Sequence, residues 1–435
     1  MFVSTTLKLS ARHALCVWAL LFLGAFGVHA QQPGEQLCGR CKTSGKVPFE
    51  VDSDLSVEHE HGPDWAVLYC SYAIESDNMG LDWSVCPRCK TPSVHDAAQL
   101  EWDALETEKQ AWLTERKRVE KLVDLDDIVY IETTHFGLTW NIPKVKADRK
   151  TYRMHDAAHL FAQRLEDFYT DLRVITGLSH EDQMVDKHYL FAFEKGQQAV
   201  AVGPAYAGLS HTGTVKRSGG EDQDSVIVTW RNKSESPTDD DFHRSIVHNM
   251  VHQITATHRN TNWFPIGELG LIPPWLNDDY GWLDAGIAHW FERRIEGNSE
   301  TYCFREQEAN RRWGSADWRR NVWKGVSSEN WPSFAHTISK PTQSLTPRDH
   351  QYAWSWVDFL MWRNAGGFGE AMKLAKLEKP TREILPAVFK VSMLAFEEEW
   401  AAWVSTQYAP SNKNPEIDPV RLYGEPAEGE DDTRR

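Results

Sequence analysis

Two histidines four residues apart, His248 and His252, place the strongest constraint on what this chain can fold into. Residues at this spacing lie on one face of an α-helix, so the two imidazoles can bind one metal ion. The preceding stretch, Ser236–Asp241, has the features of a helix start, with capping side chains, a proline and three acids. Apolar residues then recur at helical spacing from Phe242 to Ile254. The sequence therefore predicts a helix that presents two metal-ligand candidates together.

The residue after the first histidine decides whether this pair also predicts catalysis. In the motif His-Glu-x-x-His, the glutamate is the general base that takes a proton from a metal-bound water. Asn249 occupies that position here, and a neutral amide cannot take up that proton. A surface helix with two solvated histidines is the alternative, because so short a motif also occurs by chance.

The first thirty residues have the pattern of a secretory signal peptide. Two basic residues precede an apolar run from Ala14 to Val28, which ends in the cleavage-like sequence Val28-His29-Ala30. We therefore expect residues 1–30 to be removed and the protein to be exported, to the periplasm or outside the cell, without a membrane anchor. The formal charge of −16 becomes −18 when the two basic residues are lost. Such acidity argues against nucleic acid or an anionic membrane as partner.

Residues 31–93 carry two nearly identical Cys-x-x-Cys sequences, Cys-Gly-Arg-Cys-Lys-Thr and Cys-Pro-Arg-Cys-Lys-Thr. Their cysteines are Cys38, Cys41, Cys86 and Cys89. Four thiolates can surround a structural zinc ion, so this module resembles a zinc ribbon. The long separation requires an inserted hairpin, in which Cys70 could serve as a further ligand. A disulfide framework is the alternative, because exported proteins meet oxidising conditions.

Hydrophobic patterning divides the rest of the chain. We expect a charged linker helix over 94–125, the main domain over 126–410 and a disordered acidic tail over 411–435. Strands are predicted at 128–133, 136–140, 188–193 and 225–230. Helices are predicted at 152–176, 282–296, 304–313, 350–364, 367–377, 381–389 and 394–407, besides the histidine helix. Strands gathered in the first half, followed by a helical second half, indicate an α+β fold.

Two further segments extend the pattern around the histidine pair. Pro273-Pro274-Trp275 precedes Trp282-Leu283-Asp284-Ala285-Gly286-Ile287-Ala288, and aromatic-rich segments follow at 352–360 and 396–400. Together with His-Asn-Met-Val-His-Gln they resemble the gluzincins, the thermolysin-type metallopeptidases, and specifically the MA-type peptidase-like domains of exported bacterial proteins. The resemblance spans about residues 127–407. It implies a zincin-like domain, in which a small sheet and an active-site helix precede a helical C-terminal half.

The resemblance also implies a role for single residues. His248 and His252 match the two histidine ligands of zinc, Asn249 stands at the general-base position, and Ala285 replaces the glutamate that is the third ligand. Losing the base alone costs a factor of about 10²–10⁴ in rate. Two imidazoles also fall short of the three protein ligands of catalytic zinc sites. We therefore expect a pseudoenzyme that acts as a peptide-binding, protein-binding or scaffold module, for example by pairing a peptide along residues 225–230.

An active zinc hydrolase with an altered ligand set remains the alternative. His258 has the spacing of the third histidine in metzincins, although their helix-breaking glycine is replaced here. His289 or Glu292 could also replace the lost ligand, because both share a helical stripe with Ala285, but an exposed helix face is the simpler explanation of that stripe. Tyr352 could stabilise an oxyanion above the cleft, or pack inside a helical core.

Overall fold

The computed structural model describes residues 46–48, 60–61, 65–71, 83–85 and 107–411, with gaps at 148–149, 180–184, 212, 218–223, 234–235, 237, 258–279, 296–298, 300–316 and 378. The chain divides into one unit of residues 1–51 and 81–108 and another of residues 52–80 and 109–435. In the first unit, β1 (Lys46–Pro48) pairs antiparallel with β4 (Trp83–Val85). These strands adjoin the two Cys-x-x-Cys sequences in the chain. The four cysteines themselves, the signal peptide and residues 412–435 lie outside the described residues.

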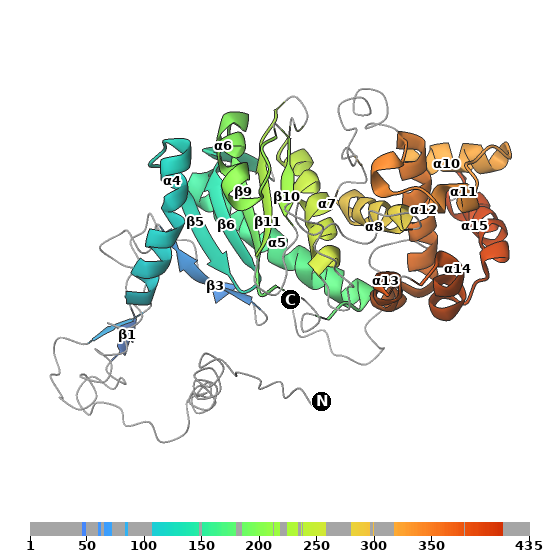
Figure 1. Ribbon diagram of the computed structural model, residues 1–435, viewed down its shortest axis with the longest axis horizontal. Coiled ribbons are helices and arrows are strands. Elements are labelled where there is room, and N and C mark those ends of the chain that lie inside the picture. Colours follow the sequence, from blue (N-terminus) through green and yellow to red (C-terminus); the bar gives the residue numbers. More distant parts are fainter. Residues whose placement is uncertain are drawn as a thin grey trace, which may run out of the picture. The chain divides into compact units, whose positions relative to one another are not determined.

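The second unit is built on a mixed sheet with strand order β10-β11-β9-β6-β5-β3-β2 (Figure 1). The strands are β2 (Glu60–His61), β3 (Trp65–Cys70), β5 (Val129–Thr133), β6 (Phe136–Asn141), β9 (His188–Phe193), β10 (Val215–Arg217) and β11 (Ser225–Trp230). β9 runs parallel to both β6 and β11, and the other pairs are antiparallel. Because β9 and β10 occupy both sides of β11, the prediction that a peptide pairs along residues 225–230 is wrong.

Helices cover both faces of this sheet. They are α4 (Arg118–Val123), α5 (Met154–Thr176), α6 (Gly196–Tyr206) and α7 (Asp239–Thr257), and a helical stretch over 107–116 precedes α4. Val129 and Ile131 of β5 pack into the core that α5 and α7 share, whereas Tyr130 packs toward α4 and α6. In Figure 1, α4 and α6 lie on one side of the sheet and α5 and α7 on the other. Strands covered on both faces read as continuous apolar runs, which is why β5, β9 and β11 could be predicted.

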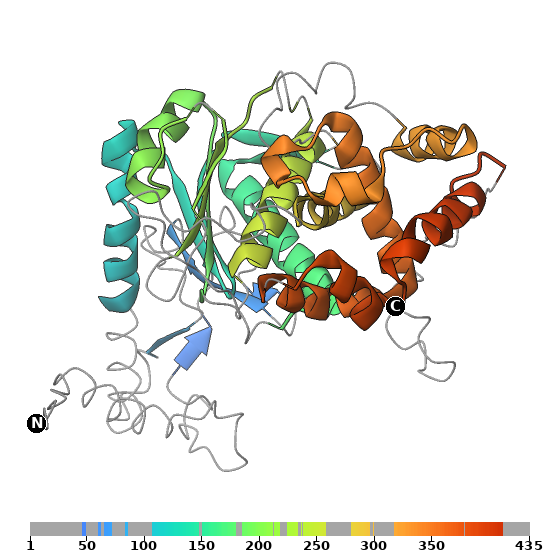
Figure 2. The same ribbon diagram turned by 45° about the vertical axis from the view of Figure 1, so that its right-hand side comes forward.

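The second half is helical, which confirms the predicted α+β order. It contains α8 (Gly281–Arg294), α10 (Trp318–Ser327), α11 (Phe334–Ile338), α12 (Pro347–Asn364), α13 (Phe368–Lys376), α14 (Thr381–Ile384) and α15 (Met393–Gln407). Short helical turns η5 (Thr342–Ser344), η6 (Ala365–Gly367) and η7 (Leu385–Phe389) connect them. Seen from a second direction, α10 to α15 (orange to red) still gather at the end of this unit away from the sheet (Figure 2). The helix expected at 304–313 lies outside the described residues.

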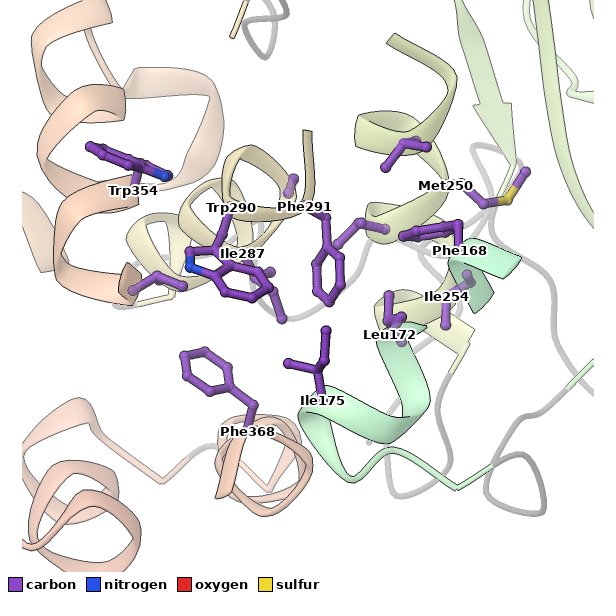
Figure 3. Close-up of a cluster of buried hydrophobic side chains, with 14 of the residues drawn as sticks. Phe168, Leu172, Ile175, Met250, Ile254, Ile287, Trp290, Phe291, Trp354 and Phe368 are labelled. Atoms are coloured by element: carbon purple, nitrogen blue, oxygen red, sulfur yellow. The ribbon is translucent and has the colours of Figure 1, made fainter. Parts of the chain in front are cut away.

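A continuous apolar core joins the sheet to the helical half. Phe168 of α5 meets Phe291 of α8 edge-on, with ring centroids 5.7 Å apart. Figure 3 shows Ile254 of α7, Trp290 of α8 and Phe368 of α13 around the same contact. This packing fixes α8 against both α5 and α7. Within the described residues, no helix combines the length and the apolarity that a bilayer crossing requires.

The sequence analysis did not predict one β-hairpin. β7 (Lys144–Ala147) pairs antiparallel with β8 (Lys150–Arg153), which leads directly into α5. The predicted helix 152–176 corresponds to α5, which ends where Gly177 adopts a left-handed conformation with φ of 70°. The hairpin therefore determines where α5 begins, and with it the position of two histidines in the first turns of that helix.

Candidate metal centre

The histidine helix α7 and the following helix α8 pack directly on each other, and α8 also packs on α12. Gly286 makes the second contact close, because a Cβ atom at this position would lie only 2.6 Å from the carbonyl oxygen of Ala353. Every residue of α8 from Gly281 to Glu292 is consequently buried. The expectation of an exposed face carrying Ala285, His289 and Glu292 is therefore wrong, since α7 and α12 cover that face.

The histidine pair is buried as well. His248 is 1% exposed and His252 is 8% exposed, so the alternative of two solvated histidines is wrong. Their Nε2 atoms lie 3.2 Å apart. A metal ion bound about 2.0–2.1 Å from each nitrogen would subtend an angle of about 100–105° at this separation, close to tetrahedral. The pair therefore has the geometry of two ligands of one ion.

Each histidine of the pair turns its other nitrogen toward a carboxylate of α8. The Nδ1 atom of His252 lies 2.7 Å from Oδ1 of Asp284, whose second oxygen accepts a 3.0 Å hydrogen bond from Thr342. The Nδ1 atom of His248 lies 3.2 Å from Oε2 of Glu292. Metal-binding histidines are commonly oriented in this way by carboxylates behind them. The sequence analysis did not assign this role to either acid. The contacts run between α7 and α8, and the spacing of residues within one helix does not reveal contacts with another helix.

Glu292 belongs to a larger polar network inside the helical half. Its Oε2 accepts hydrogen bonds from Nδ1 of His289 at 2.8 Å and from Oγ of Ser299 at 2.7 Å. The Nε2 atom of His289 lies 2.9 Å from Nδ1 of His350 on α12. His248, His289 and Glu292 thus form a buried group that could hold a metal ion. Of the two histidines suggested as a third ligand, His289 lies in this group, and His258 lies outside the described residues.

Electrostatics favour neutral imidazoles beside ionised acids. Burial lowers the pKa of His248 to about 4, and it lowers the pKa of His252 as well. Burial alone would raise the pKa of Glu292, but hydrogen bonds from His248 and His289 outweigh it and hold that pKa well below its usual range. His252 has the same effect on Asp284, whose pKa is lowered despite burial. Neutral nitrogen ligands with negative charge behind them suit a divalent cation.

The positions at which the chain departs from the peptidase pattern offer no replacement groups. The side-chain amide of Asn249 donates a 2.7 Å hydrogen bond to the carbonyl oxygen of Ser245, one turn earlier on α7. Ala285 is buried and has no ligand atom. Tyr352 lies in the aromatic core of the helical half, where its ring packs near Trp356 and Trp400. The structure thus places Tyr352 in the helical core, which was one of its two predicted positions.

A second buried group that could hold a metal ion lies between the sheet and helix α5. It consists of Cys70 at the end of β3 and of His155 and His159 on α5. The sequence analysis considered Cys70 only as an extra ligand of the cysteine module, and it missed the two histidines. Their spacing of four, the same as in the pair on α7, was the signal that could have identified them.

Comparison of the sequence with known protein families finds no match, and comparison with curated proteins finds no relative. The relation to the gluzincins stays a prediction that rests on the motifs of this chain.

Proposed function

We propose that this protein is a zincin-like metal-binding protein that holds a divalent transition metal between His248 and His252 and lacks peptidase activity. The proposal rests on the motif resemblance for the fold family and on the geometry around the two imidazoles for the metal.

The observation that carries it is the convergence of the two Nε2 atoms. A carboxylate can only accept hydrogen bonds, so Nδ1 of His248 and Nδ1 of His252 carry protons toward Glu292 and Asp284. A neutral imidazole has only one N–H, and both Nε2 atoms therefore direct a lone pair into the 3.2 Å between them. Two facing lone pairs in a buried site repel each other. A cation between them converts this repulsion into two coordination bonds.

The other arrangement, a metal bound by His248, His289 and Glu292 alone, is less favoured. The contacts of Glu292 with the two imidazole nitrogens measure 2.8 and 3.2 Å, which is the range of hydrogen bonds. Each contact is already satisfied by an imidazole N–H that donates to the carboxylate, so no metal ion is needed to explain it. The two arrangements differ in the importance of His252, which is a ligand only in the first.

Absence of hydrolysis follows from the groups around the pair. The amide of Asn249 is turned back onto its own helix, and the carboxylates of Asp284 and Glu292 are engaged with imidazole nitrogens. Among the described residues we therefore assign no general base to a metal-bound water. Full-length protein loaded with zinc should cleave casein no faster than its His248→Ala variant. Cleavage that disappears in this variant would show that the protein is an enzyme.

Metal content tests the main proposal. Full-length protein should lose one equivalent of bound metal per chain in the His248→Ala and the His252→Ala variants, as measured by plasma mass spectrometry after dialysis. The His243→Gln variant is the matched control, because it removes another buried histidine from the same helix. His289→Ala should retain the metal. Loss in His289→Ala together with retention in His252→Ala would favour the other arrangement, and retention in His248→Ala would refute both.

Peptide binding is the second candidate function, and we assign it to the edge strand β10. This short strand is the last in the sheet order among the described strands, so its outer edge is available for pairing with an extended chain. Gln253, the residue after His252 on α7, donates hydrogen bonds to the carbonyl oxygens of Arg217 in β10 (3.2 Å) and Val226 in β11 (2.9 Å), so β10 lies beside the metal centre. Panning a random-peptide display library on the protein should enrich sequences whose binding weakens in Lys216→Glu. No enrichment would contradict this function.

A further inference from the structure

The three side chains of the second buried group come from parts of the chain far apart in sequence. Cys70 ends β3, where it is in register with Ile131 of β5, and His155 and His159 occupy the first turns of α5. All three are buried, with exposed fractions of 3%, 7% and 3%. The cysteine is separated from the two histidines by 85 and 89 residues. Only the packing of α5 across the sheet brings them together.

Their donor atoms form a nearly equilateral triangle. Sγ of Cys70 lies 3.3 Å from Nε2 of His155 and 3.5 Å from Nε2 of His159, and the two nitrogens are 3.2 Å apart. Zinc binds nitrogen at about 2.0–2.1 Å and sulfur at about 2.3 Å, with tetrahedral angles. One face of such a tetrahedron has an N···N edge of about 3.3 Å and S···N edges of about 3.5 Å. The observed triangle agrees with this face within a few tenths of an ångström.

We propose that Cys70, His155 and His159 bind a zinc ion that is separate from the one at His248 and His252. A thiolate with two imidazoles is a ligand set that suits zinc, and the fourth position is left to water or another ligand. The ion cross-links the end of β3 to α5, the helix that packs on this face of the sheet. Its role is structural, since it closes a long loop in the way that a disulfide bond would.

A hydrogen-bonded cluster of the three side chains is the competing explanation, and the two make different predictions. Such a cluster needs a proton in each contact and takes up no metal, and a hydroxyl could replace the thiol with little change. A metal site needs the thiolate. Replacing Cys70 by serine separates the two, because serine is nearly the same size and a poor zinc ligand.

The test is metal content of the full-length protein. We expect Cys70→Ser and His155→Ala each to lose one equivalent of zinc per chain. Ser71→Ala should lose none and is the matched control, because it removes a buried polar group from the next position. Combining Cys70→Ser with His248→Ala should remove two equivalents, which shows that the two centres are independent. Unchanged zinc in folded Cys70→Ser would overturn the proposal, whatever the result for His248.

A measurement on the unaltered protein covers the case in which these variants do not fold. Cadmium replaces zinc in such sites, and its NMR resonance reports how many thiolates bind it. We expect a resonance from one thiolate with two imidazoles, at a position between those of all-thiolate and all-nitrogen sites. Cadmium uptake without any resonance in this intermediate region would overturn the proposal.

Discussion

Replacing Gly286 by alanine should loosen the helical half and the metal centre together. A Cβ atom at this position would lie 2.5 Å from a methyl group of Val357 and 2.6 Å from the carbonyl oxygen of Ala353. Ordinary contacts require about 3.5–4.0 Å, so α8 and α12 must separate by roughly 1 Å. Overpacking costs about 1–3 kcal/mol, and because the carbonyl oxygen of Ala353 belongs to the backbone and cannot rotate away, we expect about 2–3 kcal/mol here. The better helix propensity of alanine returns about 1 kcal/mol. We therefore expect a net loss of about 1–2 kcal/mol.

Calorimetry and metal titration can check both parts of this prediction. For a domain of this size the loss corresponds to a fall of roughly 2–8 °C in Tm. The displacement of α8 also moves Asp284 away from His252, whose contact is 2.7 Å, so metal affinity should fall by about 10–100-fold. Gly366→Ala is the control, because a Cβ atom there has no heavy atom within 4 Å. A Gly286→Ala variant as stable as wild type, with unchanged metal affinity, would refute this account of the helix contact.

Three further predictions concern pH, a buried acid and the metals. Burial, helped by Arg164 and Arg244, lowers the pKa of His243 to about 3, whereas the unfolded chain titrates near 6.5. Between these values only the unfolded state binds this proton, so His243 alone should lower the stability by about 1.4 kcal/mol per pH unit as the pH drops below 6.5. Other buried histidines, such as His248, add to this fall, and urea unfolding of His243→Gln should show a smaller slope than wild type. Asp358→Ala should cost about 2–5 kcal/mol in the same assay, because buried donors on Trp290 and Tyr408 lose their acceptor, and Asp358→Asn should cost less. Stripping the metals with a chelator should lower Tm, since a ligand at a hundred times its Kd contributes about 2.7 kcal/mol; an unchanged Tm would argue against both metal centres.

Much of the fold could be predicted from the sequence because the central strands are buried on both faces. β9 and β11 have the predicted boundaries, since their apolar runs are bounded by polar residues. β3 could not be predicted in the same way. It lies within the cysteine-bearing segment, and its partner β5 is about sixty residues further along the chain, so no local pattern shows their pairing.

The candidate site was predictable only where its residues share one helix. The pair His248 and His252 is visible from spacing, as is the loss of the glutamate at Asn249. The roles of Asp284 and Glu292 depend on the packing of α8 against α7, which buries polar residues that look solvent-exposed on a single helix. For His155 and His159 the spacing was present, but the thiol that completes the group is 85 residues or more away.

The path of the chain between its two units limits how the protein can be shortened. Residues 52–80 belong to the larger unit although residues on both sides of them belong to the smaller one. A protein truncated to begin at residue 126 would therefore lose β3 as well as the cysteine-bearing module, and β5 would become a bare sheet edge. Exposed edges of this kind recruit strands from other molecules, so we expect such a fragment to aggregate during expression. A clean separation of the units requires joining residues 52–80 to residue 109 through a new linker.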